Sequence, residues 1–182
     1  MSRESRFLSL VLRHKPEEIG LKLDGAGWVE VDNLLRALKR SGRGLSRDAL
    51  EKVVAENDKR RFTISEDGRR IRAAQGHSVE VDLELPPSPP PASLYHGTAR
   101  GNLDEIFRIG ILPRRRRQVH LSCDAETALS VGQRHGKAVV LQIAAAAMAS
   151  EGYTFHCADN GVWLTDEVPP TFIGFATNPL PD

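Results

Sequence analysis

The sequence contains few cysteines, few aromatic residues and no long apolar run. Only two of its 182 residues are cysteines, Cys123 and Cys157, and they form neither a CxxC pair nor the spacing of a metal site. Each is more typical of a small buried residue than of a ligand or a nucleophile. We therefore expect no bound metal and no cysteine nucleophile.

No apolar stretch is long enough to cross a bilayer. The run from Phe7 to Leu12 is short, is interrupted by Ser9, and is not followed by the small-residue cleavage site of a signal peptide. Charged residues make up 27 % of the chain, which indicates neither a membrane protein nor a disordered one. These features predict a cytoplasmic protein without a membrane partner.

Two common nucleotide-binding signatures, GxGxxG and the P-loop, are also missing, so neither a Rossmann nor a Walker site is indicated. The net charge of +1 does not by itself predict a nucleic-acid partner. The basic residues nevertheless cluster in Lys59–Arg61, Arg69–Arg72 and Arg114–Arg117. Tight arginine groups in a nearly neutral chain favour a local phosphate site over a long electrostatic track. The alternative is a set of solvated surface charges.

A proline-rich segment divides the chain almost in half. Five of the six residues 86–91 are prolines, which lack amide donors and fix φ, so the segment cannot form a helix or an inner strand. It should be an extended, semi-rigid connector. We therefore expect two lobes, residues 1–85 and 92–182, joined by residues 86–91.

The first lobe has the pattern of helices followed by a hairpin. A helix is predicted from about Ser5 to Arg13, a second after a cap at Asp32, and a third after a cap at Ser46. Alternating apolar residues on both sides of Asp67–Gly68 predict a β-hairpin. This order is that of a winged helix, a fold that commonly binds nucleic acid.

The second lobe mixes short strands and helices, with glycine and proline between them. The pattern is α+β and does not resemble a doubly wound sheet. The predicted strands are 94–96, 119–121, 139–143, 162–164 and 172–173, and the predicted helices are 103–107 and 125–134.

Polar motifs in the first lobe suit a phosphate. Arg13 and His14 follow each other at a predicted helix end, where a planar cation stands beside a titratable donor. They could instead merely complement the helix C-terminus. Arg61 begins the first hairpin strand, although Arg60 fits the pattern equally well. The turn Gln75–Ser78 carries a glycine that lets the backbone approach a ligand, or it is an ordinary exposed turn.

Two histidines stand at strand ends in the second lobe. The stretch Tyr95–Thr98 places His96 before a glycine and a hydroxyl, and His120–Ser122 repeats the arrangement. Either histidine alone is more often structural. Together they favour a pocket for a polar small molecule.

These motifs together resemble the RNA 2'-phosphotransferase family, the KptA-type tRNA 2'-phosphotransferases. The resemblance covers nearly the whole chain, in family order. The matching stretches are 7–16, 27–29, 58–62, 71–78, 95–98, 119–122 and 160–164.

The resemblance implies a winged-helix RNA lobe followed by an NAD lobe with the ADP-ribosyltransferase fold. The family's catalytic Arg-His-Arg-Arg set matches Arg13, His14, Arg61 and Arg116, and the arginine run permits a shift of the last member to Arg115 or Arg117. The NAD-binding positions that the resemblance implies are His96, Gly97, Thr98, His120, Leu121 and Ser122.

The implied reaction takes RNA with an internal 2'-phosphate and consumes NAD as a co-substrate. The phosphate attacks the nicotinamide-bearing ribose carbon, nicotinamide leaves, and the 2''-hydroxyl then attacks phosphorus. The products are 2'-OH RNA and ADP-ribose 1'',2''-cyclic phosphate. No metal is needed, and we expect a monomer.

Two other functions are compatible with the residues. One is an ADP-ribosyltransferase acting on terminal phosphates of nucleic acid. Transfer to protein is disfavoured because the second lobe has no paired ExE glutamates. The other is a winged-helix nucleic-acid-binding regulator that senses NAD without releasing nicotinamide.

Overall fold

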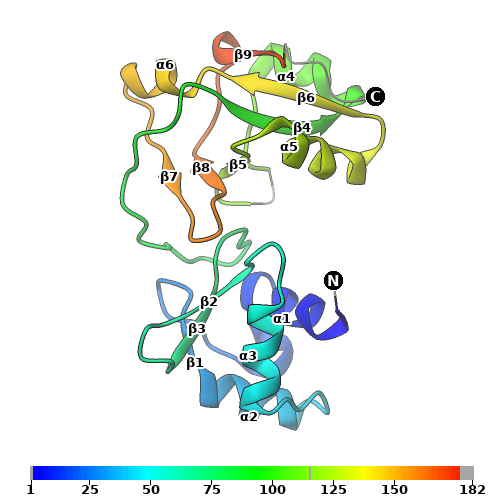
Figure 1. Cartoon of the computed structure of the whole chain (residues 1–182), viewed down its shortest axis with the longest axis vertical. Coiled ribbons are helices and arrows are strands. Elements are labelled where there is room, and N and C mark those ends of the chain that lie inside the picture. The colour runs from blue at the N-terminus through cyan, green and yellow to red at the C-terminus, as the bar shows by residue number, and fades with distance from the viewer. Residues whose placement is uncertain (1, 115, 177–182) are drawn as a thin grey trace. The chain divides into compact units, whose positions relative to one another are not determined.

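The computed structural model describes residues 2–114 and 116–176 and divides the chain into two compact units, Met1–Glu84 and Leu85–Asp182. Each unit has its own apolar core, and helices and small antiparallel sheets occur in both (Figure 1). This mixture confirms the predicted α+β class.

Within its described residues, 2–84, the first unit contains three α-helices and one short 3₁₀ helix. They are α1 (Arg3–Arg13), η1 (Pro16–Ile19), α2 (Val31–Arg40) and α3 (Arg47–Ala55). Ser2 and Ser46 cap α1 and α3 with their hydroxyls, as N-cap serines commonly do. The predicted cap at Asp32 is wrong: α2 begins at Val31, so Asp32 lies inside its first turn, where a carboxylate still favours the helix dipole.

The predicted hairpin is confirmed. Strands β2 (Phe62–Ile64) and β3 (Arg70–Ala73) pair antiparallel, and the short β1 (Val29–Glu30) joins the far side of β3. The carboxylate of Asp67 accepts bonds from the Ser65 hydroxyl and the Arg69 amide, and Gly68 takes a positive φ of 69°. Asp67 and Gly68 therefore form the turn that the sequence predicts.

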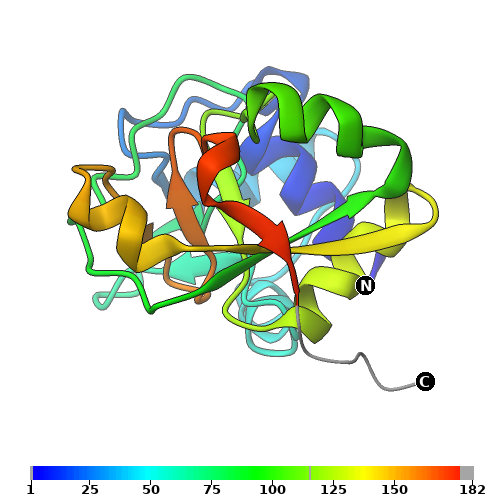
Figure 2. The ribbon, with the colours of Figure 1, turned by 90° about the horizontal axis from the view of Figure 1, so that it is seen from above.

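The part of the second unit that the structure describes contains two three-stranded antiparallel sheets. The first has the order β4 (Leu94–Ala99), β6 (Ala138–Ile143), β9 (Ile173–Phe175), with the yellow β6 between green β4 and red β9 (Figure 2). The second has the order β5 (Val119–Leu121), β8 (Trp163–Thr165), β7 (His156–Cys157). Its helices are α4 (Leu103–Ile109), α5 (Ala125–Gly132), α6 (Ala145–Ser150), η2 (Arg100–Asn102), η3 (Gln133–His135) and η4 (Pro170–Phe172).

Residues 86–91 lie along the second unit. Pro87 forms an isolated bridge with His156, and the amide of Ser88 donates to the Phe155 carbonyl at 2.8 Å. The His156 ring donates from Nδ1 to the Leu85 carbonyl at 2.8 Å. At the end of the first unit, the Arg72 side chain donates to the Leu83 carbonyl at 3.0 Å. Leu85, Pro87 and Ser88 are thus bonded to Phe155 and His156 of the second unit.

The two cysteines are free. Cys157 is half-buried, and desolvation followed by the nearby Cys123 and Asp159 raises its pKa. Cys123 is exposed, so the expectation that both cysteines are small buried residues is wrong for Cys123. No helix in the described part of the chain has the length and hydropathy to cross a membrane.

Candidate active site

The C-terminus of α1 is tied to the turn that follows β3. Arg13 is the last residue of α1 and His14 is its C-cap, because Pro16 stops the helix. The amides of Ser78 and Val79 both donate to the Arg13 carbonyl, at 2.9 and 3.4 Å. The turn Gln75–Ser78 therefore covers the end of the helix, and two motifs that are far apart in sequence meet.

The start of β2 reaches the same place. The guanidinium of Arg13 donates to the Arg61 carbonyl at 3.2 Å, and the Ala74 amide donates to the same oxygen at 2.9 Å. Gly76 passes close to the Arg13 guanidinium with a φ of +86°, a conformation that strongly favours glycine. Arg61 rather than Arg60 accepts this bond from Arg13.

The side chain of Arg61 is half-buried and donates from Nη1 to the amide oxygen of Asn57 at 3.0 Å. Its neighbour Arg60 is exposed and has a φ of 41°, which is uncommon for a residue other than glycine. Sequence reasoning missed Asn57, since its contacts with Arg61 and with α1 appear only in the folded chain.

His14 is exposed, and its Nδ1 lies 2.9 Å from the Ser78 hydroxyl. A serine hydroxyl can donate to neutral imidazole or accept from imidazolium, so the contact suits both charge states. In either state Nε2 can carry a proton. Arg13, His14 and the backbone of Arg61 thus lie together at the end of α1, and side chains of these types suit an anion.

A buried histidine, His77, lies close enough to Arg13 and His14 for their charges to affect it. His77 is only 4 % exposed, and burial followed by the positive charges of Arg13, His14 and Arg72 lowers its pKa to about 4. It is therefore neutral at pH 7. Its Nε2 is buried without a hydrogen-bond partner among the described atoms and faces Gly27, where an added Cβ would approach it to 3.3 Å.

In the second unit, the two predicted histidines lie on adjacent chain segments. The backbones of Tyr95 and Ser122 exchange two hydrogen bonds, of 2.9 and 2.8 Å, which join β4 to the end of β5. Nδ1 of His96 lies 3.3 Å from the His120 carbonyl, and Nδ1 of His120 lies 3.0 Å from the Gln118 carbonyl. A carbonyl oxygen only accepts, so both rings carry a proton on Nδ1 and present Nε2 as an acceptor when neutral.

The other predicted cofactor residues contribute differently. Gly97 packs its bare face against α5, where an added Cβ would collide with the Ala128 carbonyl. Thr98 is buried, and its hydroxyl accepts a 3.1 Å bond from Asn102. Leu121 is 1 % exposed and belongs to the core. Among the predicted cofactor residues, partly exposed side chains remain at His96, His120 and Ser122.

The arginine run begins after α4. Arg114 pairs with Glu105 at 2.9 Å, and the Arg116 amide donates to the Pro113 carbonyl at 3.0 Å. The Arg116 side chain reaches the surface, yet its guanidinium is partly desolvated, and this together with the positive charge of Arg134 lowers its pKa. Arg117 is exposed, and Arg115 is outside the described residues. Arg116 belongs to the second unit, whereas Arg13, His14 and Arg61 belong to the first.

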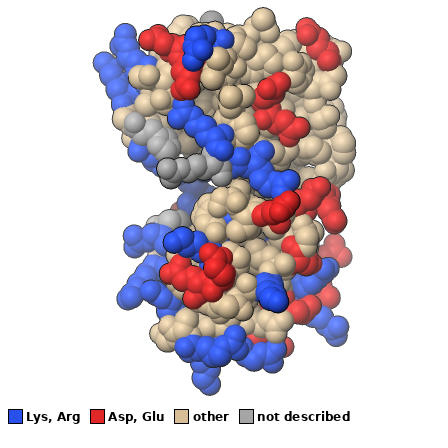
Figure 3. All heavy atoms as spheres, turned by 180° about the vertical axis from the view of Figure 1, so that it is seen from behind, with Lys and Arg blue, Asp and Glu red and all other residues tan. Residues whose placement is uncertain are grey.

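The surface charge is mixed. On the face shown in Figure 3, basic and acidic side chains are interspersed on both units. Within the described part of the chain no three His, Cys, Asp or Glu side chains are grouped as metal ligands. On this face, acidic side chains accompany the basic ones, as expected where basic residues do not form a continuous track.

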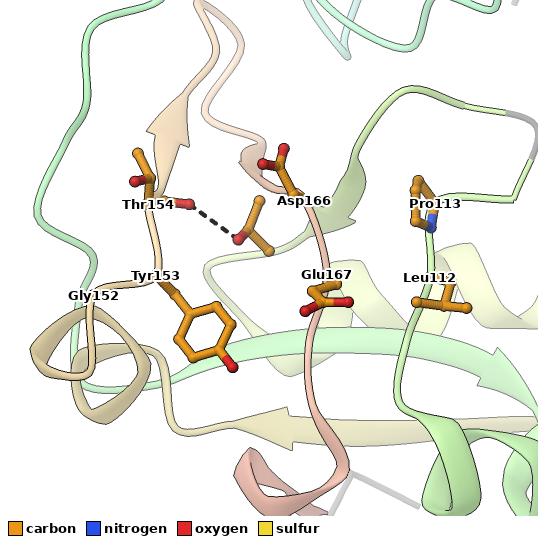
Figure 4. Close-up of a pocket in the computed structure, with 8 residues that line it drawn as sticks. Leu112, Pro113, Gly152, Tyr153, Thr154, Asp166 and Glu167 are labelled. Carbon is orange, nitrogen blue, oxygen red and sulfur yellow. Dashed lines mark hydrogen bonds between the residues drawn. The ribbon is translucent and has the colours of Figure 1, made fainter.

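A pocket of about 360 Å³ lies elsewhere in the second unit, and none of the predicted site residues lines it. Figure 4 shows the carboxylates of Asp166 and Glu167 and the ring of Tyr153 around it, with the Thr165 hydroxyl donating to the Thr154 carbonyl at 3.0 Å. Two carboxylates disfavour an anionic ligand, so this pocket is a poor phosphate site.

Comparison with known proteins gives one consistent family. The model of the family described as "RNA 2'-phosphotransferase, Tpt1 / KptA family" matches residues 1–167. A relative from Agrobacterium fabrum named "Probable RNA 2'-phosphotransferase" is 59 % identical over 169 residues, which cover 93 % of this chain and 91 % of that protein. Relatives with the same name from Pseudomonas fluorescens and Burkholderia pseudomallei are 54 % and 51 % identical, covering 93 % and 96 % of this chain and 93 % and 95 % of theirs.

Proposed function

The chain belongs to the RNA 2'-phosphotransferase, Tpt1 / KptA family of enzymes, and on this basis we propose that it transfers an internal RNA 2'-phosphate to NAD. The observation that carries the proposal is the group of Arg13, His14 and Arg61, brought together at the end of α1. Guanidinium and imidazolium groups bind phosphate through charge-assisted hydrogen bonds.

The reaction proceeds in two steps. In the first, an oxygen of the RNA 2'-phosphate forms a bond to the nicotinamide-bearing ribose carbon, and the carbon–nitrogen bond breaks with its electron pair leaving on nicotinamide. In the second, the ribose 2''-hydroxyl attacks phosphorus and the bond to the RNA 2'-oxygen breaks. The hydroxyl proton is lost and the RNA oxygen gains one. The products are 2'-OH RNA and ADP-ribose 1'',2''-cyclic phosphate.

Arg13 and Arg61 hold the phosphate and stabilise the charge that develops on its oxygens. Arg116 is the fourth member of the catalytic set that the family resemblance implies. His14, fixed at Nδ1 by Ser78, donates a hydrogen bond or exchanges a proton at the phosphate through Nε2. The nucleophiles belong to the substrates, so no serine, cysteine or carboxylate nucleophile is required.

NAD binds to the second unit, beside His96 and His120. An Nε2 acceptor suits the hydroxyl donors of a ribose. The Nε2 of His120 is buried, so His96 is the better placed of the two to contact NAD. Ser122 supplies a further hydroxyl, while Gly97, Thr98 and Leu121 shape the site through the backbone and the core.

The first unit is a winged-helix lobe and the second an ADP-ribosyltransferase-like lobe. Helix α3 is poorly suited to contact RNA through Arg47, since this arginine bonds to Glu51 and to the Gly68 carbonyl. In the first unit the RNA contact centres on the end of α1 and the start of β2, where Arg13, His14 and Arg61 lie.

The test incubates the protein with NAD and an oligonucleotide that carries one internal 2'-phosphate. Nicotinamide and dephosphorylated RNA should appear in equal amounts. A second oligonucleotide with only a 5'-phosphate tests transfer to a terminal phosphate. Binding of both substrates without nicotinamide release would overturn the proposal in favour of a regulator, and nicotinamide release with the terminal phosphate alone would favour an ADP-ribosyltransferase.

A further inference from the structure

A buried amide connects Arg61 to helix α1. Asn57 is 7 % exposed and Ser5, in the first turn of α1, is 3 % exposed. The amide oxygen of Asn57 accepts from the Arg61 side chain at 3.0 Å and from the Arg61 backbone at 3.4 Å. Its amide nitrogen donates to the Ser5 hydroxyl at 2.8 Å. We call these three residues the Ser5–Asn57–Arg61 relay.

The chemistry of the three groups fixes the orientation of the amide. A guanidinium and a backbone N–H only donate, so the side of Asn57 that faces Arg61 must be its oxygen. The nitrogen then faces Ser5, whose hydroxyl can accept. Among side chains of this size, a neutral amide supplies an acceptor and a donor on opposite sides without placing a negative charge beside Arg61.

The backbone of Asn57 shapes the same turn. Its carbonyl accepts from the Arg60 amide at 2.7 Å, and its amide donates to the Val54 carbonyl at the end of α3. Arg60 takes its positive φ within this turn. Such a conformation persists only where the surroundings enforce it. Asn57 thus contributes to both the path of the chain into β2 and the direction of the Arg61 side chain.

We propose that Asn57 is a positioning residue that orients Arg61 for the phosphate, with Ser5 anchoring Asn57 to the helix that also carries Arg13. This rests on the proposed function, in which Arg61 binds the transferred phosphate. The bond at Nη1 fixes the rotation of the guanidinium plane. A planar, bidentate donor loses most of its advantage when its plane can turn.

The experiment is a double-mutant cycle in the full chain, with Asn57→Ala made in the wild-type and Arg61→Ala backgrounds. Consumption of the phospho-ADP-ribose intermediate is followed with labelled RNA. Asn57→Ala should slow this step about ten- to a hundredfold in the wild-type background, as expected for loss of one charge-assisted bond. In the Arg61→Ala background it should slow the step less than about threefold, because the group that it orients is gone.

The control is Asn33→Ala, which removes another asparagine–arginine bond, of 2.6 Å to Arg36, on the exposed face of α2. It should leave the rate unchanged. Equal slowing by Asn57→Ala in both backgrounds would show a merely structural role and overturn the proposal, as would no slowing at all. If Asn57→Ala does not fold, Ser5→Ala is made in the same two backgrounds. It should slow consumption of the intermediate in the wild-type background, by less than Asn57→Ala would, and have little effect in the Arg61→Ala background. Equal slowing in both backgrounds, or none, would overturn the proposal.

Failure of the proposed function gives a different result. In that case wild-type protein releases no nicotinamide with the 2'-phosphorylated RNA. The relay is then tested by the affinity for inorganic phosphate, which Asn57→Ala should weaken about tenfold if Asn57 orients Arg61 at an anion site. Equal affinity of the wild type and the variant would overturn the relay.

Discussion

Arg61 and Arg60 stand side by side in the chain but differ in their surroundings. Arg61 is half-buried and bonded to Arg13 and Asn57, while Arg60 is exposed. The sequence pattern left the choice between them open, since both precede an alternating strand. The contact that distinguishes Arg61 joins residues 48 positions apart, so no local pattern could have shown it.

Replacing Arg61 by lysine should therefore impair the second chemical step. A lysine keeps the charge but cannot present a planar fork, and losing one charge-assisted bond costs about 1.5–3 kcal/mol. We expect roughly a ten- to hundredfold slower second step and accumulation of the phospho-ADP-ribose intermediate on a gel time course. Arg60→Lys is the matched control and should behave as wild type. Equal loss in both variants would contradict the assignment of Arg61.

His77 provides a pH-dependent prediction. Its folded pKa of about 4 lies below the ordinary value of 6.5, so the unfolded chain binds the proton more tightly. The stability due to neutral His77 is complete above pH 6.5 and falls as the pH drops from 6.5 to 4. The loss is about 3 kcal/mol across this window.

The measurement is urea unfolding at several pH values for the wild type and His77→Gln. The wild-type free energy of unfolding should fall more steeply between pH 6.5 and 4 than that of the variant. Parallel curves would show that His77 titrates normally in the folded protein.

Among the elements, α5 and β4 pack so closely that one position must be glycine. Gly97 of β4 faces the Ala128 carbonyl of α5, and the amide and carbonyl of Thr98 lie near Gly132. The family resemblance implies that Gly97 is an NAD-binding position, and this stays a prediction. In the fold its bare side lies against a helix.

Gly97→Ala should consequently destabilise the second unit whether or not NAD is present. Overpacking against backbone costs about 3 kcal/mol, which lowers the melting temperature by several degrees in a chain of this size. Gly101→Ala is the control, because an added Cβ there meets no atom within 4 Å. If the Gly97→Ala protein were as stable as the wild type but bound NAD more weakly, Gly97 would contact the ligand and would not be required for packing against α5.

Local patterns predicted α1, the β2–β3 hairpin and most strands of the second unit, since caps, turns and apolar alternation act over a few residues. Among the α-helices and strands of the described residues, β1, β7 and α6 were not predicted. The two strands have only two residues each, and they exist because β3 and β8 offer them partners. Helix α6 is a short alanine-rich stretch without an N-cap side chain, and it is secured by burying Ala145 and Met148. Asn57 was missed for the same reason, as its partner Ser5 is 52 residues away.

At the scale of the whole molecule, charge is balanced and interspersed on the face of Figure 3, so RNA affinity should depend weakly on salt. A site in which about three arginines contact single-stranded RNA phosphates gives a slope of log affinity against log salt of about −2. The measurement is the dissociation constant of 2'-phosphorylated RNA at several salt concentrations between about 50 and 200 mM. The same RNA without the 2'-phosphate is the control and should bind more weakly. A slope near −5 would indicate an extended basic track instead.

The bonds on either side of Glu84 also set the tether between the units. Leu83 is held by Arg72 and Leu85 by His156, and Glu84, at a φ of 53°, stands between them. The segment after Leu85 adds little length to this connection, because Pro87 and Ser88 are bonded to His156 and Phe155 of the second unit. A tether this short keeps the effective concentration of one unit at the other high. Splitting the chain at Glu84 removes this effective concentration. Activity of the two mixed halves should therefore require protein concentrations far above those at which the intact chain is active.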